Sequence, residues 1–240
     1  MLELNKIHLG DAYKLIKEIP DNSVDCIYTD VPYKYDMGSC GSSELAQRIQ
    51  KKKDDLIAND IYDGLNYEIL NEFLRISKKV NCYIWCSKLQ INEIMNFFLS
   101  KGYFFEILVW CKTNPTPSTN NVWLPDLEYC LYFRESGVKL NDGYEFKSKW
   151  YITPINKSDK DLFEHPTIKP IELVKRHLLH TTQDGDIVFD PFVGSGTTCV
   201  GAKDLNRQYL GIEISPKWHK VACDRLNCFT AGGQQSLFLM

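Results

Sequence analysis

Two segments of the chain each end an apolar run in polar residues that could act on a ligand. Residues 187–198 read Ile-Val-Phe-Asp-Pro-Phe-Val-Gly-Ser-Gly-Thr-Thr, and residues 29–33 read Thr-Asp-Val-Pro-Tyr after the largely apolar residues 24–28. Such a run is typical of a buried parallel strand whose carboxyl end faces a ligand, and glycines there allow a close approach of the backbone. We therefore expect the two segments to lie side by side above one sheet, one for a cofactor and one for a substrate.

The segment around Asp190 suits a nucleoside with an anionic tail. A helix that begins near Thr197 presents unpaired backbone N–H groups and a partial positive charge to an anion, and Thr197 and Thr198 add hydroxyl groups. The next apolar run, residues 208–212, ends in Glu213, whose carboxylate is placed to accept hydrogen bonds from ribose hydroxyls. These residues predict an adenosine-type ligand. A dinucleotide site is disfavoured, because Cys199 stands where its last glycine is expected.

Hydrophobic periodicity predicts an α/β fold with a mostly parallel, seven-stranded sheet and helices on both of its faces. The two runs at 103–111 and 127–133 have no helix between them, so they are expected to form an antiparallel hairpin. The strand-like runs are 5–9, 24–29, 81–86, 103–111, 127–133, 186–190 and 208–213, and the helix-like segments are 66–80, 88–101, 170–180, 197–206 and 216–229.

Length and composition indicate one globular domain over residues 1–240, with polar inserts at 34–62 and 112–164. The net charge of −3 excludes a uniformly basic nucleic-acid coat, so duplex binding needs a local patch such as residues 48–53. Nine cysteines without a Cys-x-x-Cys pair predict reduced thiols and no metal site. The chain has no long apolar run and no signal-like start, so we expect a cytoplasmic protein without a membrane span.

The run from Asp190 to Thr198 resembles the S-adenosylmethionine-binding motif of the DNA amino-methyltransferases. Residues 165–170, His-Pro-Thr-Ile-Lys-Pro, are similar to the family segment that flanks the methionine end of the cofactor, where Lys169 would pair with the carboxylate. Asp11 resembles the family acid that faces the adenine amino group, and it also suits the cap of a helix over 12–19. The resemblance implies cofactor contacts by Asp11, Asp30, His165, Thr167, Lys169, Asp190, Phe192, Gly194, Ser195, Gly196, Thr197, Thr198 and Glu213.

Residues 29–33 resemble the catalytic tetrapeptide of the same family, commonly Asp-Pro-Pro-Tyr or Ser-Pro-Pro-Tyr. The resemblance implies that Asp30 and the carbonyl of Val31 accept hydrogen bonds from the two protons of an exocyclic amine, while Tyr33 stacks on a base flipped out of the duplex. Val31 departs from the family, which usually has proline there, although Pro32 still biases it toward an extended conformation. From the sequence, Val31→Pro is expected to keep or raise activity.

The catalytic motif precedes the cofactor motif, which resembles the circularly permuted beta class with its single Rossmann-like domain. An acid at position 30 favours adenine N6 as the methyl acceptor, with cytosine N4 as the alternative. A non-catalytic nucleic-acid-binding protein, an RNA or small-molecule methyltransferase and a nicotinamide dehydrogenase are further alternatives. Double-stranded DNA is the expected partner, and a homodimer and a partner restriction nuclease stay open.

Residues 110–117, Trp-Cys-Lys-Thr-Asn-Pro-Thr-Pro, look like the family segment that borders the DNA cleft. The inserts offer basic residues for phosphates and aromatic residues for stacking. The candidates are Arg48, Lys51, Lys52, Lys53, Lys147, Lys149 and Lys157 for phosphates, and Trp123, Trp150 and Tyr151 for stacking.

Overall fold

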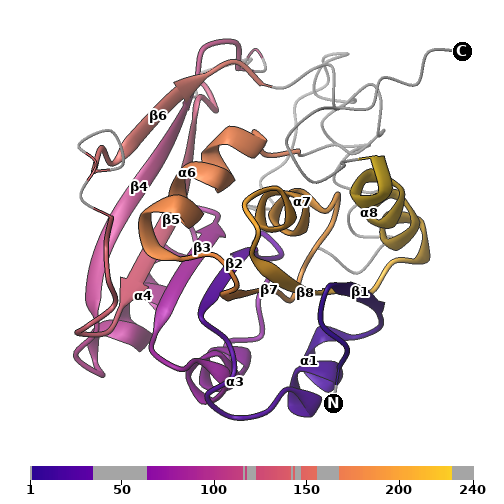
Figure 1. The fold of residues 1–240 in the computed structure, drawn as a ribbon. Coiled ribbons are helices and arrows are strands. Elements are labelled where there is room, and N and C mark those ends of the chain that lie inside the picture. Colours follow the sequence, from indigo (N-terminus) through magenta and orange to yellow (C-terminus); the bar gives the residue numbers. More distant parts are fainter. Residues whose placement is uncertain are drawn as a thin grey trace, which may run out of the picture.

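A mixed sheet of eight strands in the order β1-β8-β7-β2-β3-β5-β4-β6 forms the centre of the protein (Figure 1). The computed structural model describes residues 2–34, 64–115, 117, 123–141, 143, 147–155 and 168–228. Within them all strands but β5 run in one direction, because β5 pairs antiparallel with both β3 and β4. The strands are β1 (Lys6–Leu9), β2 (Cys26–Asp30), β3 (Asn81–Cys86), β4 (Phe104–Lys112), β5 (Leu127–Arg134), β6 (Trp150–Thr153), β7 (Ile187–Asp190) and β8 (Gln208–Glu213).

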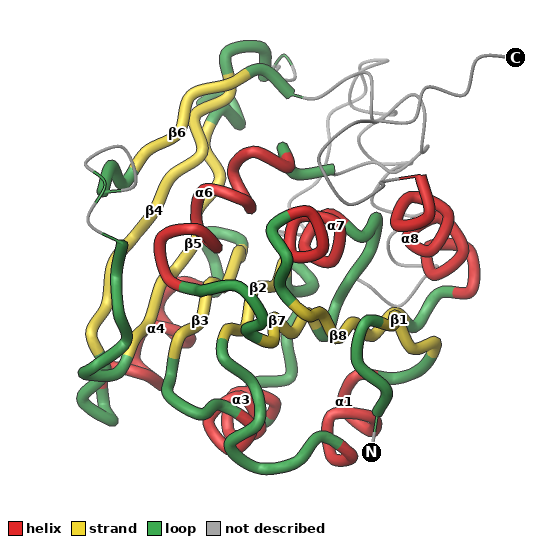
Figure 2. The backbone as a smooth tube through the Cα atoms, viewed as in Figure 1, coloured by secondary structure: helices red, strands yellow, loops and turns green. Residues whose placement is uncertain are grey.

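Helices cover both faces of the sheet (Figures 1 and 2). The α1, η1, α3 and α4 elements pack on one face, and α6, α7 and α8 pack on the other. Their bounds are α1 (Ala12–Leu15), the 3-10 helix η1 (Ile16–Glu18), α3 (Ile69–Ile76), α4 (Ile91–Leu99), α6 (Ile171–Thr181), α7 (Thr197–Asp204) and α8 (Pro216–Cys228). None of these helices is long and apolar enough to cross a membrane.

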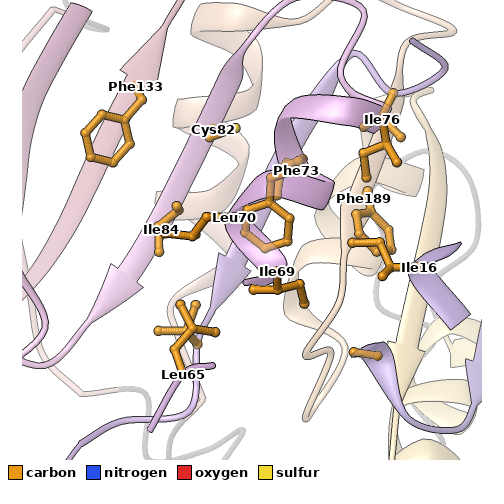
Figure 3. Close-up of a cluster of buried hydrophobic side chains, with 14 of the residues drawn as sticks. Ile16, Leu65, Ile69, Leu70, Phe73, Ile76, Cys82, Ile84, Phe133 and Phe189 are labelled. Atoms are coloured by element: carbon orange, nitrogen blue, oxygen red, sulfur yellow. The ribbon is translucent and has the colours of Figure 1, made fainter. Parts of the chain in front are cut away.

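Alternation along the strands divides the core into two layers. In β3, Cys82 and Ile84 belong to the layer under α3, whereas Tyr83 and Trp85 belong to the layer under α6. Figure 3 shows Phe73 of α3 in the first layer, where it is fully buried with Cys82 and Ile84. Burial of apolar surface at about 25 cal/mol per Å² on both faces therefore fixes the sheet between its helices.

The topology confirms the α/β class and the antiparallel pairing of the runs at 103–111 and 127–133. The late strands β7 and β8 lie between β1 and β2, as expected for a permuted order. The prediction of seven strands was wrong by one. Trp150–Thr153, inside the predicted insert 112–164, forms β6 and pairs in parallel with β4. Four residues are too few for a periodic signal, and their strand conformation depends on the backbone of a distant neighbour.

The first helix also differs from the expectation, and the predicted insert at 34–62 lies almost entirely outside the described residues. The segment 12–19 is a short α-helix followed by a 3-10 turn rather than one continuous helix. Only Lys34 of the predicted insert 34–62 falls within the described residues.

The sheet brings the two sequence motifs together, although they stand near opposite ends of the chain. In β2, Cys26 and Ile27 pair in parallel with Val188 and Phe189 of β7. Because parallel strands share a direction, Asp30 and Asp190 leave the same edge of the sheet. This carboxyl edge is the candidate site.

Candidate active site at the carboxyl edge of the sheet

The turn between β7 and α7 depends on two glycines with left-handed backbone conformations. Gly194 has φ 53° and Gly196 has φ 85°, values that other residues rarely adopt. A Cβ atom at Gly196 would also lie 3.0 Å from the Cβ of Ala222 in α8. Glycine is therefore required at position 196 both by conformation and by the close approach of α8.

Glu213 ends β8 and holds this turn in place. Its Oε2 accepts a hydrogen bond from the N–H of Gly194 at 2.7 Å, and its Oε1 accepts one from the N–H of Ser215 at 2.8 Å. Burial raises the pKa of Glu213, although these N–H groups act in the opposite direction. Each carboxylate oxygen has a further lone pair, so the group fits a nucleoside ribose while it supports the loop.

Asp190 is buried at the end of β7 and caps the turn that follows. Its Oδ1 accepts a hydrogen bond from the N–H of Phe192 at 3.0 Å. Burial raises the pKa of Asp190 to about 7, although the hydroxyl of Thr198 and the N–H of Phe192 act in the opposite direction. Phe192 itself lies 6.0 Å from Tyr13, centroid to centroid, so the turn packs on the first helix.

Arg225 supports the same turn from α8, and sequence reasoning missed it. Its side chain is fully buried, and its Nη1 donates to the Thr197 hydroxyl at 2.8 Å and to the Ser195 carbonyl at 3.1 Å. A signal was present, because Arg225 follows Ala222 by three residues and so shares its buried face of the helix. The Thr197 hydroxyl, predicted to meet an anion, is thus directed to the protein, and a bound anion is left with backbone N–H groups.

Asp11 lies next to this cluster at the end of β1. The N–H of Gly10 donates to the carbonyl of Glu213 at 2.9 Å, which joins the ends of β1 and β8. The Asp11 Oδ1 accepts a hydrogen bond from the N–H of Tyr13 at 2.9 Å, so its capping role is confirmed. Its contact with the adenine amino group stays a prediction.

The second motif continues directly from β2. The N–H of Val31 donates to the carbonyl of Trp85 at 3.1 Å, which extends the pairing of β2 with β3 by one residue. Asp30 Oδ1 is buried and has no hydrogen-bond partner within the described part of the chain. A buried acceptor of this kind favours a substrate that brings a donor.

Lys169 is the centre of the charges at the site. Its ammonium group forms ion pairs with Asp30 Oδ2 and, at 2.9 Å, with Glu128 Oε2 of β5. It also lies 3.4 Å from the Tyr33 hydroxyl and 5.1 Å from the centre of the Trp85 ring. Burial acts to lower the pKa of Lys169, but Asp30 and Glu128 outweigh it and raise this pKa, so the ammonium stays charged.

Glu128 connects this cluster to a second lysine. Its Oε1 lies 2.7 Å from Nζ of Lys112, which ends β4. Burial acts to raise the pKa of Glu128, but Lys169 and Lys112 lower it to about 2. The carboxylate is therefore ionised at neutral pH and links two ammonium groups. Sequence reasoning missed Glu128, although an acid within the apolar run 127–133 was an available signal.

The pKa of Asp30 is shifted in the opposite direction to that of Glu128, although burial and Lys169 act on both carboxyl groups. Burial raises the pKa of Asp30, although Lys169 beside it acts in the opposite direction. Two carboxylates and two ammonium groups thus alternate in the order Asp30, Lys169, Glu128 and Lys112. The cluster is formally neutral, which reduces the cost of burying its charges.

Several predicted residues lie elsewhere or outside the described residues. His165, Thr167, Arg48, Lys51, Lys52, Lys53 and Lys157 belong to segments that the structure does not describe. Lys149 forms an ion pair with Glu106, and Tyr151 is half-buried against the layer under α6. Trp150 is 59% exposed. Among the described residues, no group of three or more His, Cys, Asp or Glu side chains could hold a metal ion.

Comparison with known proteins gives one family. Residues 24–224 match the family N6_N4_Mtase, described as DNA methylase. The chain is 31% identical over 236 residues to the Type II methyltransferase M2.DpnII of Streptococcus pneumoniae, covering 90% of this chain and 87% of that protein. It is 31% identical over 237 residues to M2.LlaDCHI of Lactococcus lactis subsp. cremoris, covering 91% and 87%.

Solved structures share the fold of this chain. The crystal structure of the M1.HpyAVI–SAM complex aligns with a TM-score of 0.69 and 25% identity, over 92% of this chain and 99% of that one. The PvuII DNA methyltransferase, described as cytosine-N4-specific, aligns with a TM-score of 0.66 and 15% identity, over 94% and 88%. The second likeness carries the fold alone.

Glu128→Gln should lower the free energy of unfolding by about 3 kcal/mol at pH 7, because it leaves Lys112 and Lys169 short of a buried counter-charge. The folded-state pKa of Glu128 is depressed, so its stabilisation is present above about pH 4.5 and is lost as the pH falls toward about 2. Urea unfolding of both proteins across this range measures the difference.

Glu106→Gln is the matched control, since Glu106 pairs with Lys149 in an ion pair whose side chains are 48% and 59% exposed. Its cost should stay below about 1 kcal/mol. Equal costs for the two substitutions would contradict a special role of Glu128.

Proposed function

Because the chain belongs to the N6_N4_Mtase family of DNA methylases and is a methyltransferase that uses S-adenosylmethionine, we propose a specific methyl acceptor. The acceptor is the N6 amine of adenine in duplex DNA. The observation that supports this proposal is the position of Asp30, whose buried Oδ1 lacks a hydrogen-bond partner among the described residues. An exocyclic amine brings the donor that this acceptor needs.

The proposed mechanism is a direct methyl transfer without a covalent enzyme intermediate, in which the amine nitrogen would bond to the methyl carbon while the carbon–sulfur bond breaks and S-adenosylhomocysteine leaves. An exocyclic amine is a weak nucleophile, because its lone pair is delocalised into the ring. Asp30 and the carbonyl of Val31 would accept hydrogen bonds from the two N–H groups of the amine and so localise that lone pair. The base would have to leave the duplex, which costs a few kcal/mol, and Tyr33 would then stack on the flipped base. S-adenosylmethionine supplies the activated methyl group, and orientation and preorganised acceptors would supply most of the acceleration.

The cofactor would bind across the ends of β1, β8 and β7. We assign the ribose to Glu213 and the methionine carboxylate to the backbone N–H groups at the start of α7. The N–H groups of Gly194 and Gly196 already donate within the protein, to Glu213 and to the Val193 carbonyl. Lys169 remains a proposed partner of the same carboxylate, which would share its ammonium group with Asp30 and Glu128. Asp11, Asp190, Phe192, Ser195, Thr197 and Thr198 complete the proposed set, together with His165 and Thr167 beyond the described residues.

Base readout is assigned to the two segments that the sequence singled out, 34–62 and 112–164, within one catalytic domain of residues 1–240. Lys112 supports this assignment, because it belongs to residues 110–117 and also reaches the catalytic cluster through Glu128. Contacts to phosphates would give affinity that falls with salt, and contacts to base edges would give the recognition sequence.

Asp30→Ala should reduce methyl transfer by at least about 10²–10³-fold, because the buried acceptor of the amine proton is lost. Cofactor affinity should change far less. Long-read modification mapping of DNA from cells that express either protein reports the base, its position and the sequence context together. We expect N6-methyladenine in a short recurring sequence with the wild type and none with the variant.

Asp224→Ala is a matched control, since Asp224 also pairs with a lysine but lies on the exposed side of α8. It should leave the modification pattern unchanged. N4-methylcytosine in place of N6-methyladenine would overturn the proposed acceptor, and wild-type methylation by Asp30→Ala would overturn the proposed role of Asp30.

Val31→Pro should lower stability by about 1 kcal/mol and should not raise turnover. The structure changes the expectation from the sequence, because the Val31 N–H donates to the Trp85 carbonyl and proline has no N–H. Val31→Ala keeps the N–H while it removes side-chain packing. Melting temperatures and turnover of both variants separate the two effects, and a Val31→Pro protein more active than the wild type would refute this account.

We further propose that the protein acts as a homodimer through an exposed apolar strip on β4, β5 and β6. Ile107, Leu127, Trp150 and Ile152 are 39–59% exposed, and strand register puts them on one face of the sheet. A second copy offers the same apolar strip, as an isologous interface requires. A partner nuclease of the same recognition sequence is proposed from the Type II names of the relatives.

The double variant Trp150→Glu, Ile152→Lys should sediment as a monomer at a concentration where the wild type sediments as a dimer, because charges replace the centre of the strip. Leu4→Glu changes an exposed residue just before β1, the strand at the other edge of the sheet from β6, and should leave the dimer intact. Analytical ultracentrifugation decides, and a monomeric wild type would contradict the dimer.

A further inference from the structure

Gln90 makes four hydrogen bonds from one fully buried side chain at the start of α4. Its Nε2 donates to the carbonyl of Pro32 at 2.9 Å, and its Oε1 accepts from the N–H of Lys34 at 3.1 Å. The same Oε1 accepts from the N–H of Ser87 at 3.1 Å and from the Ser87 hydroxyl at 2.9 Å. One amide thus joins the loop after β2 to the loop after β3.

The arrangement continues the strand pairing beyond the end of β2. The last backbone hydrogen bond between the two segments runs from Val31 to Trp85. Beyond it, the Gln90 amide bonds a carbonyl and an N–H two residues apart, as the backbone of a neighbouring strand would do. The side chain therefore holds Pro32, Tyr33 and Lys34 where the backbone ladder has ended.

Local bonding at the start of α4 accounts for the two hydrogen bonds from Ser87 but not for those to Pro32 and Lys34. Gln90 occupies the N-cap position of α4, yet its side chain makes no hydrogen bond to the helix. An N-cap residue normally uses its side chain for the first N–H groups of its own helix. Here two of the four bonds go to Pro32 and Lys34 in the loop that carries Tyr33, so the amide fastens that loop to the turn before α4.

We propose that Gln90 is a positioning residue for methyl transfer, which sets the direction of the Val31 carbonyl and the place of the Tyr33 ring. This inference rests on the proposed roles of those two residues. The need is specific to this chain, since Val31 does not fix its own φ as a proline would, and the loop gains rigidity from Gln90 instead. Displacement of about 1 Å in such a site costs up to about 10²-fold in rate.

Gln90→Met and Gln90→Glu test the inference in the full-length protein. Methionine keeps the approximate volume and removes all four hydrogen bonds, and glutamate removes the donor to Pro32. Both variants should lose about 10- to 100-fold in kcat. The Kd for S-adenosylmethionine should stay within about threefold of the wild type, because the cofactor motif lies on β7 and β8. Assays are run below the melting temperature of each variant.

The control is Gln183→Met, which makes the same substitution at an exposed glutamine beyond α6. It should leave kcat unchanged. Hydrogen exchange of the Lys34 amide provides a second measurement that needs no variant to fold. This N–H should exchange slowly in the wild type because it donates a hydrogen bond to Gln90 Oε1, and rapid exchange would overturn the inference.

Failure of the inference is distinct from failure of the proposed function. Wild-type kcat in folded Gln90→Met, together with an inactive Asp30→Ala, would refute the role of Gln90 alone. An equal loss of kcat and cofactor affinity would indicate a general structural role and would also refute it. Absence of methyl transfer by the wild type would instead refute the proposed acceptor.

Discussion

The ion pairs of Lys169 connect the parts of the site that the chain itself keeps far apart. Its ammonium group meets Asp30 at the end of β2 and Glu128 near the start of β5, and Glu128 in turn meets Lys112 at the end of β4. Burial would be costly for any one of these charges alone. Because they alternate in sign, the pKa of Glu128 is lowered and that of Lys169 is raised, which keeps both groups charged, and each member restricts the others.

The cofactor side of the site depends on buried polar groups that hydrogen-bond to the turn between β7 and α7. Glu213 holds the Gly194 N–H, and Arg225 holds the Thr197 hydroxyl and the Ser195 carbonyl. These bonds fix the backbone of the turn and direct the Thr197 hydroxyl toward the protein. The surface of the turn is then largely backbone, which suits an anion and a nucleoside better than mobile hydroxyl groups would. Specific side chains are needed here mainly to shape the backbone.

Catalytic and cofactor segments are positioned by neighbouring strands, which explains how a permuted chain builds one site. Parallel pairing of β2 with β7 places their carboxyl ends at one edge, whatever their order in the sequence. The pairing ends before the catalytic loop does. Gln90 and the Val31 N–H supply the remaining hydrogen bonds, so the exact course of this loop depends on β3 and α4 as much as on its own residues.

The sequence by itself determined the fold class, the antiparallel hairpin and the strand ends that form the site, because burial periodicity and turn residues are local properties. It did not reveal β6, whose four residues become a strand only by pairing with β4. Nor did it reveal that Glu128, Arg225 and Gln90 serve the site. Their types are ordinary, and their roles arise from partners many residues away. Tertiary structure alone decided those contacts, since a pattern predicts which residues are buried but not what they meet.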